Sequence, residues 1–376
     1  MLLVVNAGSS SVKVVLFDGG AELARGMVAE IGGAAVVEVG GAKYARPVAD
    51  HGAALLALIE GMGLSVGSLA AVAHRVVHGG AALTATCRVT AEVEAQIAAC
   101  IPLAPLHNPA NLMGLRAMTA LAPDLPQYVS FDTAFHATNP EVATAYALPL
   151  AERERGIRRY GFHGISYAAL VRKVQEMAGN KLPDRLLALH LGNGASLCAI
   201  HAGHSVATTM GYSPLDGLTM GTRTGAIDGN AVLRLAEVHG IDGAARILNR
   251  ESGLLGLGGA SDMRALRAAG TAEAAFALDH FAYWAVRHAG SMVAAMGGLD
   301  AIAFTGGIGE NDRAMRAAIV EGLGYLGAEL DPAANEANAA QVHSATSRVA
   351  IHVVPAEEER HIAKEAMAIM ASEASG

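Results

Sequence analysis

The chain has 376 residues, a formal net charge of −8 and only 27 basic side chains, which gives no indication of a nucleic-acid partner. Hydrophobic residues make up 52% of the chain and aromatic residues only 4%, so we expect a core of small and aliphatic side chains. No apolar run is long and uncharged enough for a membrane span, and the 3 cysteines form no C-x-x-C. Together with the lack of a basic segment before Leu2, these features predict a cytoplasmic protein with no membrane association.

The first predicted element is a β-hairpin with a small polar turn. Apolar residues 2–5 and 12–17 flank Asn6, Ser10 and two further serines, and Lys13 follows the turn. Backbone amides, hydroxyls and a cation at such a tip can bind a phosphate. The alternative is an ordinary serine-rich turn, because no Walker A motif is present.

Helices and strands then alternate up to a domain boundary that we place near residue 148. The pattern predicts helices over 51–61, 91–100 (N-cap Thr90) and 110–121, and strands over 70–77 and 127–130. Arg75 lies near the end of one strand and Asp132 just after the other. Arginine forks bind carboxylates and phosphates. The alternative is that each arginine pairs with a structural carboxylate.

The second half repeats the strand, glycine turn, strand pattern. Apolar strands 186–191 and 197–200 flank a turn that contains Asn193 and Gly194. This recurrence predicts a duplicated architecture with a nucleotide between the halves, although 44 glycines also allow a chance repeat.

A third glycine segment follows the predicted strand 301–305. Residues 306–311 are expected to form a glycine turn, and 312–323 a helix, an arrangement that suits close backbone approach to a nucleotide. The last helix, about 357–372, is expected to pack on the first domain.

Other polar groups lie in tight turns or at segment ends. Arg223 is in the turn 220–225, and His107 and His163 each occupy a turn of their own. With 15 histidines in the chain, a structural role is the alternative for each histidine. Asp132 and the glutamates 357–359 are candidates to hold Mg²⁺, and a solvated first helical turn is the alternative for the glutamates.

Eight motifs in order carry a resemblance to a known family. They are N-A-G-S-S-S-V-K, H-R-V-V-H-G-G, A-P-L-H-N-P, F-D-T-A-F-H, Y-G-F-H-G, H-L-G-N-G, M-G-T-R and G-G-I-G-E-N. As a set, from Asn6 to about Glu359, they resemble the acetokinase family.

The resemblance implies an α/β fold of two duplicated actin/hexokinase-like domains with a central cleft. The N-terminal domain would comprise residues 1–148 and about 359–376, and the nucleotide-binding domain residues 149–358. It also implies a homodimer that transfers a phosphoryl group reversibly between ATP and acetate, to give acetyl phosphate and ADP. Mg²⁺ would be the metal, with Mn²⁺ as an alternative.

The resemblance also implies roles for individual residues. Those for catalysis are Arg75, Asp132, His163 and Arg223. Those for the nucleotide and its phosphates are Ser10, Lys13, His190, Asn193, Gly194, Asp262, Met263, Arg264, Gly307, Ile308, Gly309 and Asn311, with His107 near the phosphate path. Arg75 would also contact the substrate, and the methyl pocket would comprise Val77, Leu106, Phe162 and Pro214. Asn6 and Glu358 would hold the metal.

Three positions depart from the family pattern. Tyr167 stands where the family commonly has a second histidine, Glu357 replaces an asparagine and Met263 replaces a phenylalanine. None of these changes removes a proposed catalytic residue.

Phosphoryl transfer to a carboxylate agrees with the residue types present. An ionised carboxylate needs no general base, and cations and backbone donors are needed to bring two anions together. Two alternatives stay open: a propionate or butyrate kinase of the same family, and a non-catalytic nucleotide-binding protein of the actin or Hsp70 type.

Overall fold

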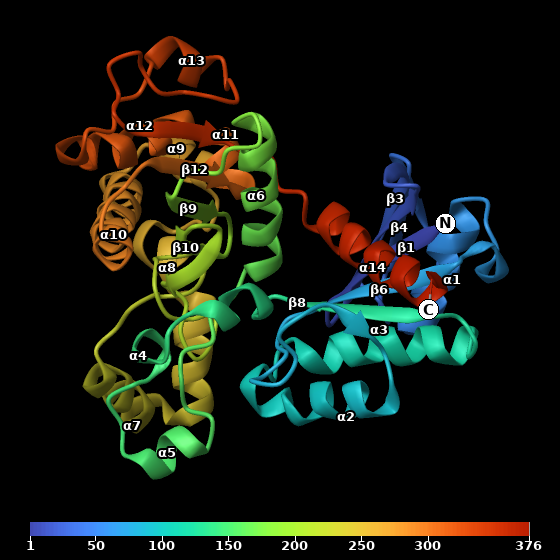
Figure 1. Cartoon of the computed structure of the whole chain (residues 1–376). Helices are drawn as coiled ribbons and strands as arrows, with labels where there is room; N and C mark the ends of the chain where they lie inside the picture. Colours follow the sequence, from blue (N-terminus) through green and yellow to red (C-terminus); the bar gives the residue numbers. More distant parts are fainter. Residues whose placement is uncertain (376) are drawn as a thin grey trace. The chain divides into compact units, whose positions relative to one another are not determined.

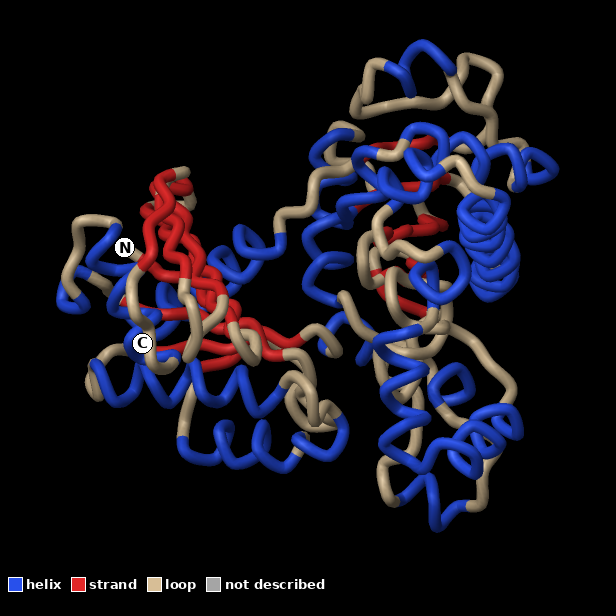
Figure 2. Tube along the Cα trace, turned by 180° about the vertical axis from the view of Figure 1, so that it is seen from behind, coloured by secondary structure: helices blue, strands red, loops and turns tan. Residues whose placement is uncertain are grey.

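A computed structural model describes residues 1–375, which form two compact units (Figures 1 and 2). One unit comprises Met1–Phe135 and the segment from Glu357 onward, and the other comprises His136–Ala356. The contacts therefore divide the chain at Phe135, earlier than the boundary near residue 148 expected from the sequence. The assignment of the second part as the nucleotide-binding domain stays a prediction.

The first unit is built on an eight-stranded sheet. In spatial order its strands are β5 (Ala42–Ala45), β4 (Val36–Val39), β3 (Ala21–Ala29), β2 (Ser11–Asp18), β1 (Leu2–Ala7), β6 (Ala71–Val76), β8 (Gln127–Phe131) and β7 (Cys87–Arg88). The predicted hairpin is confirmed, because β1 pairs antiparallel with β2. β6 and β8 extend the sheet parallel to β1, so their carboxyl ends meet at the same edge.

The second unit contains a five-stranded sheet. Its order is β11 (His204–Thr208), β10 (Ala195–His201), β9 (Arg185–Leu191), β12 (Ala301–Thr305) and β13 (Ala350–Val353). The first three strands are antiparallel neighbours, and β12 and β13 run parallel to β9. This repeats the order and directions of β3, β2, β1, β6 and β8, so the expected duplication is confirmed.

Helices cover the two faces of the first sheet. They are α1 (His51–Gly61), α2 (Ala91–Ala99), α3 (Asn108–Leu121) and α14 (Glu358–Ser375). Alternate residues of β1, Leu3 and Val5, pack in one core with Leu55 of α1 and Met118 of α3, as a period of two requires. α14 packs on β1 and β6 from the side opposite α3 (Figure 1). α14 belongs to the same compact unit as residues 1–135.

The second sheet is flanked by α6 and α10 (Figure 1). The helices of this unit are α4 (Glu141–Thr144), α5 (Leu150–Glu154), α6 (Gly164–Met177), α7 (Gly229–Arg246), α8 (Gly253–Gly258), α9 (Met263–Ala269), α10 (Ala272–Met296), α11 (Gly306–Asn311), α12 (Arg313–Gly322) and α13 (Pro332–Glu336). Side-chain caps begin several of them, as at Asp262 and Thr271.

Two local predictions were wrong. The segment 306–311 is the short helix α11 rather than a glycine turn, and β6 ends at Val76, so Val77 lies in a bend outside the strand. Within residues 1–375, no helix is both long and apolar enough to cross a membrane.

Candidate functional site

The hairpin of the first unit presents its polar turn between β1 and β2. Asn6 lies opposite Lys13 in the antiparallel register. The amide of Gly8 donates to the carbonyl of Ser11 at 2.8 Å, and the carbonyl of Gly8 lies 2.7 Å from Nε2 of His51 on α1. Ser10 and Lys13 are exposed. The backbone of the turn is therefore fixed by its hydrogen bonds to Ser11 and His51, whereas its hydroxyl and ammonium groups are accessible to solvent.

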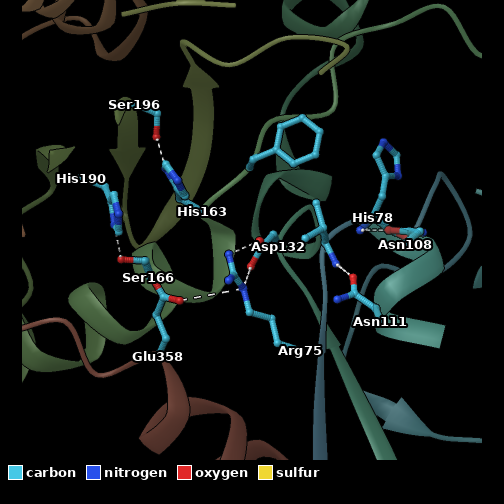
Figure 3. Close-up of polar contacts among 12 residues, drawn as sticks. Arg75, His78, Asn108, Asn111, Asp132, His163, Ser166, His190, Ser196 and Glu358 are labelled. Carbon is cyan, nitrogen blue, oxygen red and sulfur yellow. Dashed lines mark hydrogen bonds and ion pairs between the residues drawn. The ribbon is translucent and has the colours of Figure 1, made fainter. Parts of the chain in front are cut away.

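Arg75, Asp132 and Glu358 form a charged cluster in the same unit (Figure 3). Arg75 on β6 donates from Nε to Oδ1 of Asp132 at 3.1 Å and from Nη2 to Oδ2 at 2.6 Å. Oε2 of Glu358, at the start of α14, lies 3.9 Å from Nε of Arg75. The side chain of Asp132 is only 3% exposed, whereas those of Arg75 and Glu358 are 22% and 19% exposed. The cluster thus combines a buried anion with two partly accessible groups.

Burial and charge oppose one another in this cluster. Burial lowers the pKa of Arg75, but Asp132 and Glu358 outweigh it and raise the pKa above its usual value. Burial raises the pKa of Glu358 to about 7; Arg75 opposes that rise and Asp132 adds to it. The two carboxylates therefore repel one another, which is the situation that a cation relieves.

Two asparagines on α3 hold the segment that follows Arg75 (Figure 3). Oδ1 of Asn111 accepts the amide of Val77 at 3.0 Å, and its Nδ2 donates to the carbonyl of Ala7 at 2.8 Å. Oδ1 of Asn108 accepts the amide of His78 at 3.1 Å. We did not single out either asparagine from the sequence. Two amides three residues apart at the start of an apolar helix were the available signal.

The residues of the predicted methyl pocket that belong to this unit differ in exposure. Val77 is 7% exposed, whereas Leu106 is 54% exposed. His107 precedes α3 as its N-cap residue, without a side-chain cap bond. Their roles toward a substrate stay predictions.

Two stacked histidines mark the second unit (Figure 3). The rings of His163 and His190 are 4.0 Å apart with an angle of 24° between their planes. Nδ1 of His163 lies 2.9 Å from Oγ of Ser196, and Nδ1 of His190 lies 2.8 Å from Oγ of Ser166. His163 itself adopts a left-handed backbone conformation, with φ of 59°. Left-handed backbone is uncommon in non-glycine residues, and strained positions of this kind cluster at functional sites.

The glycine turn between β9 and β10 borders His163 and Arg223. A Cβ on Gly194 would lie 3.3 Å from Nε2 of His163 and 3.7 Å from Nη1 of Arg223. The amide of Gly221 donates to the carbonyl of Asn193 at 3.0 Å. A side chain at position 194 would therefore crowd the ring of His163, and glycine leaves the backbone of this turn open.

Arg223 has no carboxylate partner within residues 1–375. Its Nη1 donates to the carbonyl of Pro214 at 3.2 Å and contacts Sδ of Met220 at 3.8 Å. Burial lowers the pKa of Arg223, because no anion offsets the loss of solvent. A partly buried arginine without a carboxylate partner is typical of a site that binds an anionic ligand.

A cavity of about 740 Å³ opens beside the same turn. Its lining includes most of the residues that the sequence analysis assigned to the nucleotide: Asn193, Asp262, Met263, Arg264, Gly307, Ile308 and Asn311. Gly309 is buried within α11 and does not line it. Arg267 and Asp312, which we did not single out, form an ion pair at 2.8 Å at its wall. The cavity size suits a nucleoside-sized ligand.

Within residues 1–375, no three or more histidine, cysteine or acidic side chains are grouped so as to hold a metal ion. Magnesium, however, is usually held by one or two carboxylates together with water and substrate phosphates. The repelling pair Asp132 and Glu358 supplies such carboxylates, so these residues fit a metal that arrives with phosphates.

The family comparison covers almost the whole chain. The model of the Acetokinase family matches residues 1–364. The acetate kinase of Leifsonia xyli subsp. xyli is 45% identical over 394 aligned residues, which cover 99% of this chain and 99% of the relative. The acetate kinase of Streptomyces avermitilis is 42% identical and covers 98% of this chain and 97% of the relative.

Solved structures show the same fold. The crystal structure of Porphyromonas gingivalis acetate kinase superposes with a TM-score of 0.91 at 36% identity, over 98% of this chain and 99% of that one. The crystal structure of a propionate kinase from Francisella tularensis subsp. tularensis SCHU S4 also gives a TM-score of 0.91, at 34% identity, over 97% of this chain and 98% of that one. The expected fold class is confirmed.

Proposed function

Because the chain belongs to the acetokinase family, we propose that it transfers the γ-phosphoryl group of ATP reversibly to acetate, giving acetyl phosphate and ADP. One observation carries the choice of acceptor: relatives named acetate kinase align over nearly the full length of the chain. The charged groups of the site support it, since they suit the approach of one anion to another.

Acetate is already an anion at neutral pH, so its oxygen can attack the γ-phosphorus without a general base. The attacking carboxylate oxygen forms a bond to phosphorus as the bond to the β-phosphate oxygen breaks, and ADP leaves with that electron pair. The enzyme must offset charge on the transferring group. Nothing in this scheme requires a covalent phosphoenzyme.

In the first unit, Arg75 would bind the carboxylate or the phosphoryl group through its fork. Asp132 would orient the fork, since it accepts two hydrogen bonds from it. Asn6 and Glu358 would hold Mg²⁺, or Mn²⁺, with Asp132 as the second carboxylate nearby, and the metal would offset negative charge on the phosphates. Ser10 and Lys13, both exposed on the hairpin, would contact phosphate oxygens.

In the second unit, His163 and Arg223 would donate hydrogen bonds to the transferring group. Both border Gly194, and His190 stacks on His163. The amides of the turn 192–194 would contact the phosphates, and the cavity lined by Met263 and Ile308 would hold the nucleoside.

Propionate is the main alternative acceptor, because the solved propionate kinase superposes on this chain as well as the acetate kinase does. Steady-state assays of ATP-dependent ADP formation with acetate, propionate and butyrate test the proposal. The expected result is the highest kcat/KM for acetate. ATP binding with no turnover on any of the three acids would contradict the proposal and favour a non-catalytic nucleotide-binding protein.

We also propose a cytoplasmic homodimer. Large apolar side chains are exposed on α7, where Leu233 is 62% and Ile241 is 81% exposed, and on α10, where Tyr283 is 64% exposed. Other large apolar side chains are exposed elsewhere on the chain, but α7 and α10 each carry more than one, and exposed apolar residues grouped on one helix are typical of an interface. Sedimentation of the wild type against Ile241→Asp tests this, and the variant is expected to shift toward monomer. The free cysteines of the chain agree with a reducing compartment.

A further inference from the structure

A buried tyrosine lies behind the histidine pair. Tyr167 on α6 is fully buried, and its hydroxyl oxygen lies 2.5 Å from Oγ of Ser196 on β10. The same Oγ lies 2.9 Å from Nδ1 of His163. These two groups are the only hydrogen-bond partners of the Ser196 side chain within residues 1–375. The three side chains are therefore linked by two successive hydrogen bonds, from Tyr167 through Ser196 to the ring of His163.

The number of protons that these three side chains carry determines which of them donates in each hydrogen bond. Burial raises the pKa of Tyr167 well above its usual value, so the phenol keeps its proton and needs an acceptor for it. The phenol oxygen accepts a hydrogen bond from the backbone of His190, which lowers its pKa, so we assign its own proton to the bond with Oγ of Ser196, 2.5 Å away. Ser196 has one hydroxyl proton of its own, and the remaining partner for it is Nδ1 of His163.

From this geometry we propose that Tyr167 is a positioning residue that acts through Ser196 to keep His163 neutral, with its proton on Nε2. Nε2 is the ring atom nearest Gly194, since a Cβ there would lie 3.3 Å from it. The proposal rests on the proposed function, in which His163 donates a hydrogen bond to the transferring phosphoryl group. It assigns a role to one of the three residues at which the chain departs from the family pattern.

The other groups around His163 favour the same neutral form. His190 stacks on it from β9, and the Arg223 guanidinium borders the same glycine. A second proton, on Nδ1, would make the ring a cation beside that arginine, and a proton on Nδ1 in either form would reverse the hydrogen bond to Ser196. Tyr167 is thus one of several features that keep Nε2 as a donor and Nδ1 as an acceptor.

Tyr167→Phe tests the proposal, because it removes the hydroxyl and keeps the buried ring. Ser196 can then accept from His163, so the proton on the ring is free to move to Nδ1. We expect kcat for acetate to fall about tenfold, as for loss of one bond in a buried network, with KM values for ATP and acetate within about twofold. The acidic limb of the pH profile of kcat should move to higher pH.

A double-mutant cycle separates a role through Ser196 from a general packing effect. If the proposal holds, Ser196→Ala lowers kcat similarly, and adding Tyr167→Phe has little further effect. Tyr128→Phe is the matched control, because it removes another buried hydroxyl, bonded at 2.7 Å to Glu373 in the first unit. It is expected to leave kcat and its pH profile unchanged.

A direct measurement does not depend on activity. The ¹⁵N shifts of the His163 ring in the folded protein report which nitrogen carries the proton. The proposal expects a protonated Nε2 and a bare Nδ1 in the wild type, and a mixture in Tyr167→Phe. A proton on Nδ1 in the wild type, or additive effects in the cycle, would overturn it. If instead the wild type shows no acetate-dependent turnover, the proposed function fails, while the ring shifts still decide the tautomer.

Discussion

Arg75 and Asp132 are joined by two hydrogen bonds, with Nε and Nη2 of the arginine 3.1 and 2.6 Å from the two carboxylate oxygens. Their strands, β6 and β8, are parallel neighbours, and Arg75 lies opposite Ser130 in the register. Asp132 follows the end of β8 by one residue, so its carboxylate reaches back to the guanidinium. The sequence analysis gave pairing with a structural carboxylate as the alternative role of Arg75. That pairing is present, and it also orients the guanidinium group.

Arg75→Ala is expected to reduce turnover by about a hundredfold or more, because the guanidinium proposed to bind the transferring group is lost. It also removes the cation that Asp132 and Glu358 share, so the free energy of unfolding should fall by about 1–3 kcal/mol. Steady-state kinetics and urea unfolding measure the two effects. Arg185→Ala is the control, since Arg185 makes a similar forked pair with Asp300 away from the proposed site residues. An Arg75 variant as active as this control would exclude Arg75 from the mechanism.

Arg223→Ala should lower turnover by a similar factor, about a hundredfold, but with a different effect on stability. Arg223 has no carboxylate partner in the described chain, and burial lowers its pKa. Its removal therefore leaves no buried anion, and the urea midpoint should stay the same or rise. Comparing the midpoints of the two arginine variants checks this difference. A large loss of stability in Arg223→Ala would indicate a structural role instead.

Apolar runs and turn residues in the sequence were enough to predict most of the fold. Thr90 begins α2 by accepting from the amide of Val93, and the helix over 51–61 has the predicted bounds. The short helix α11 was missed because its residues, glycine-rich from Gly306 to Gly309, have low intrinsic helix propensity; the helix forms in its tertiary context.

The sequence did not predict which residues from distant segments of the chain are in contact at the site. The sequence indicated that Arg75 and Asp132 carry chemistry, but not that two parallel strands would bring together these residues, which are 57 positions apart in the chain. Asn111 and Ser196 were missed for the same reason, since each acts on a residue more than thirty positions away. Buried amides and hydroxyls have no sequence period of their own, and their partners are known only once the strands are placed.

The stability of the protein should fall in mild acid. Burial lowers the pKa of His74, His78, His136 and His352 to about 4, whereas an exposed histidine titrates near 6.5. Between these values the unfolded chain binds more protons than the folded chain, so stability rises with pH and is lost as pH falls from about 6.5 to 4. Each such histidine contributes up to about 1.4 kcal/mol per pH unit.

Urea midpoints between pH 7.5 and pH 5 measure this slope. His74→Gln should flatten it, because the buried ring and its titration are removed together, whereas His239→Gln, at an exposed position on α7, should leave it unchanged. A midpoint that is constant over this range in the wild type would contradict the expectation.

Val77→Ala tests the proposed choice of acceptor. Val77 is 7% exposed and its amide is held by Asn111 at 3.0 Å, so its backbone position is set even though it lies beyond the end of β6. A β-branched side chain is stiff, and we expect it to limit the space beyond one methyl group. Because one methylene is worth about 1–3 kcal/mol in an apolar pocket, acetate should be preferred over propionate by about ten- to two-hundredfold in kcat/KM.

In Val77→Ala the ratio of kcat/KM for propionate to that for acetate should rise, mainly through a lower KM for propionate, since the shorter side chain leaves room for the extra methylene. Val72→Ala is the matched control: Val72 is a buried valine of β6 in the hydrophobic core, where truncation costs stability through a cavity but does not alter acceptor space. Both variants should unfold at lower urea concentration than the wild type, and only the first should change the ratio. An unchanged ratio in Val77→Ala would show that this valine is part of the core alone and that other residues choose the acceptor.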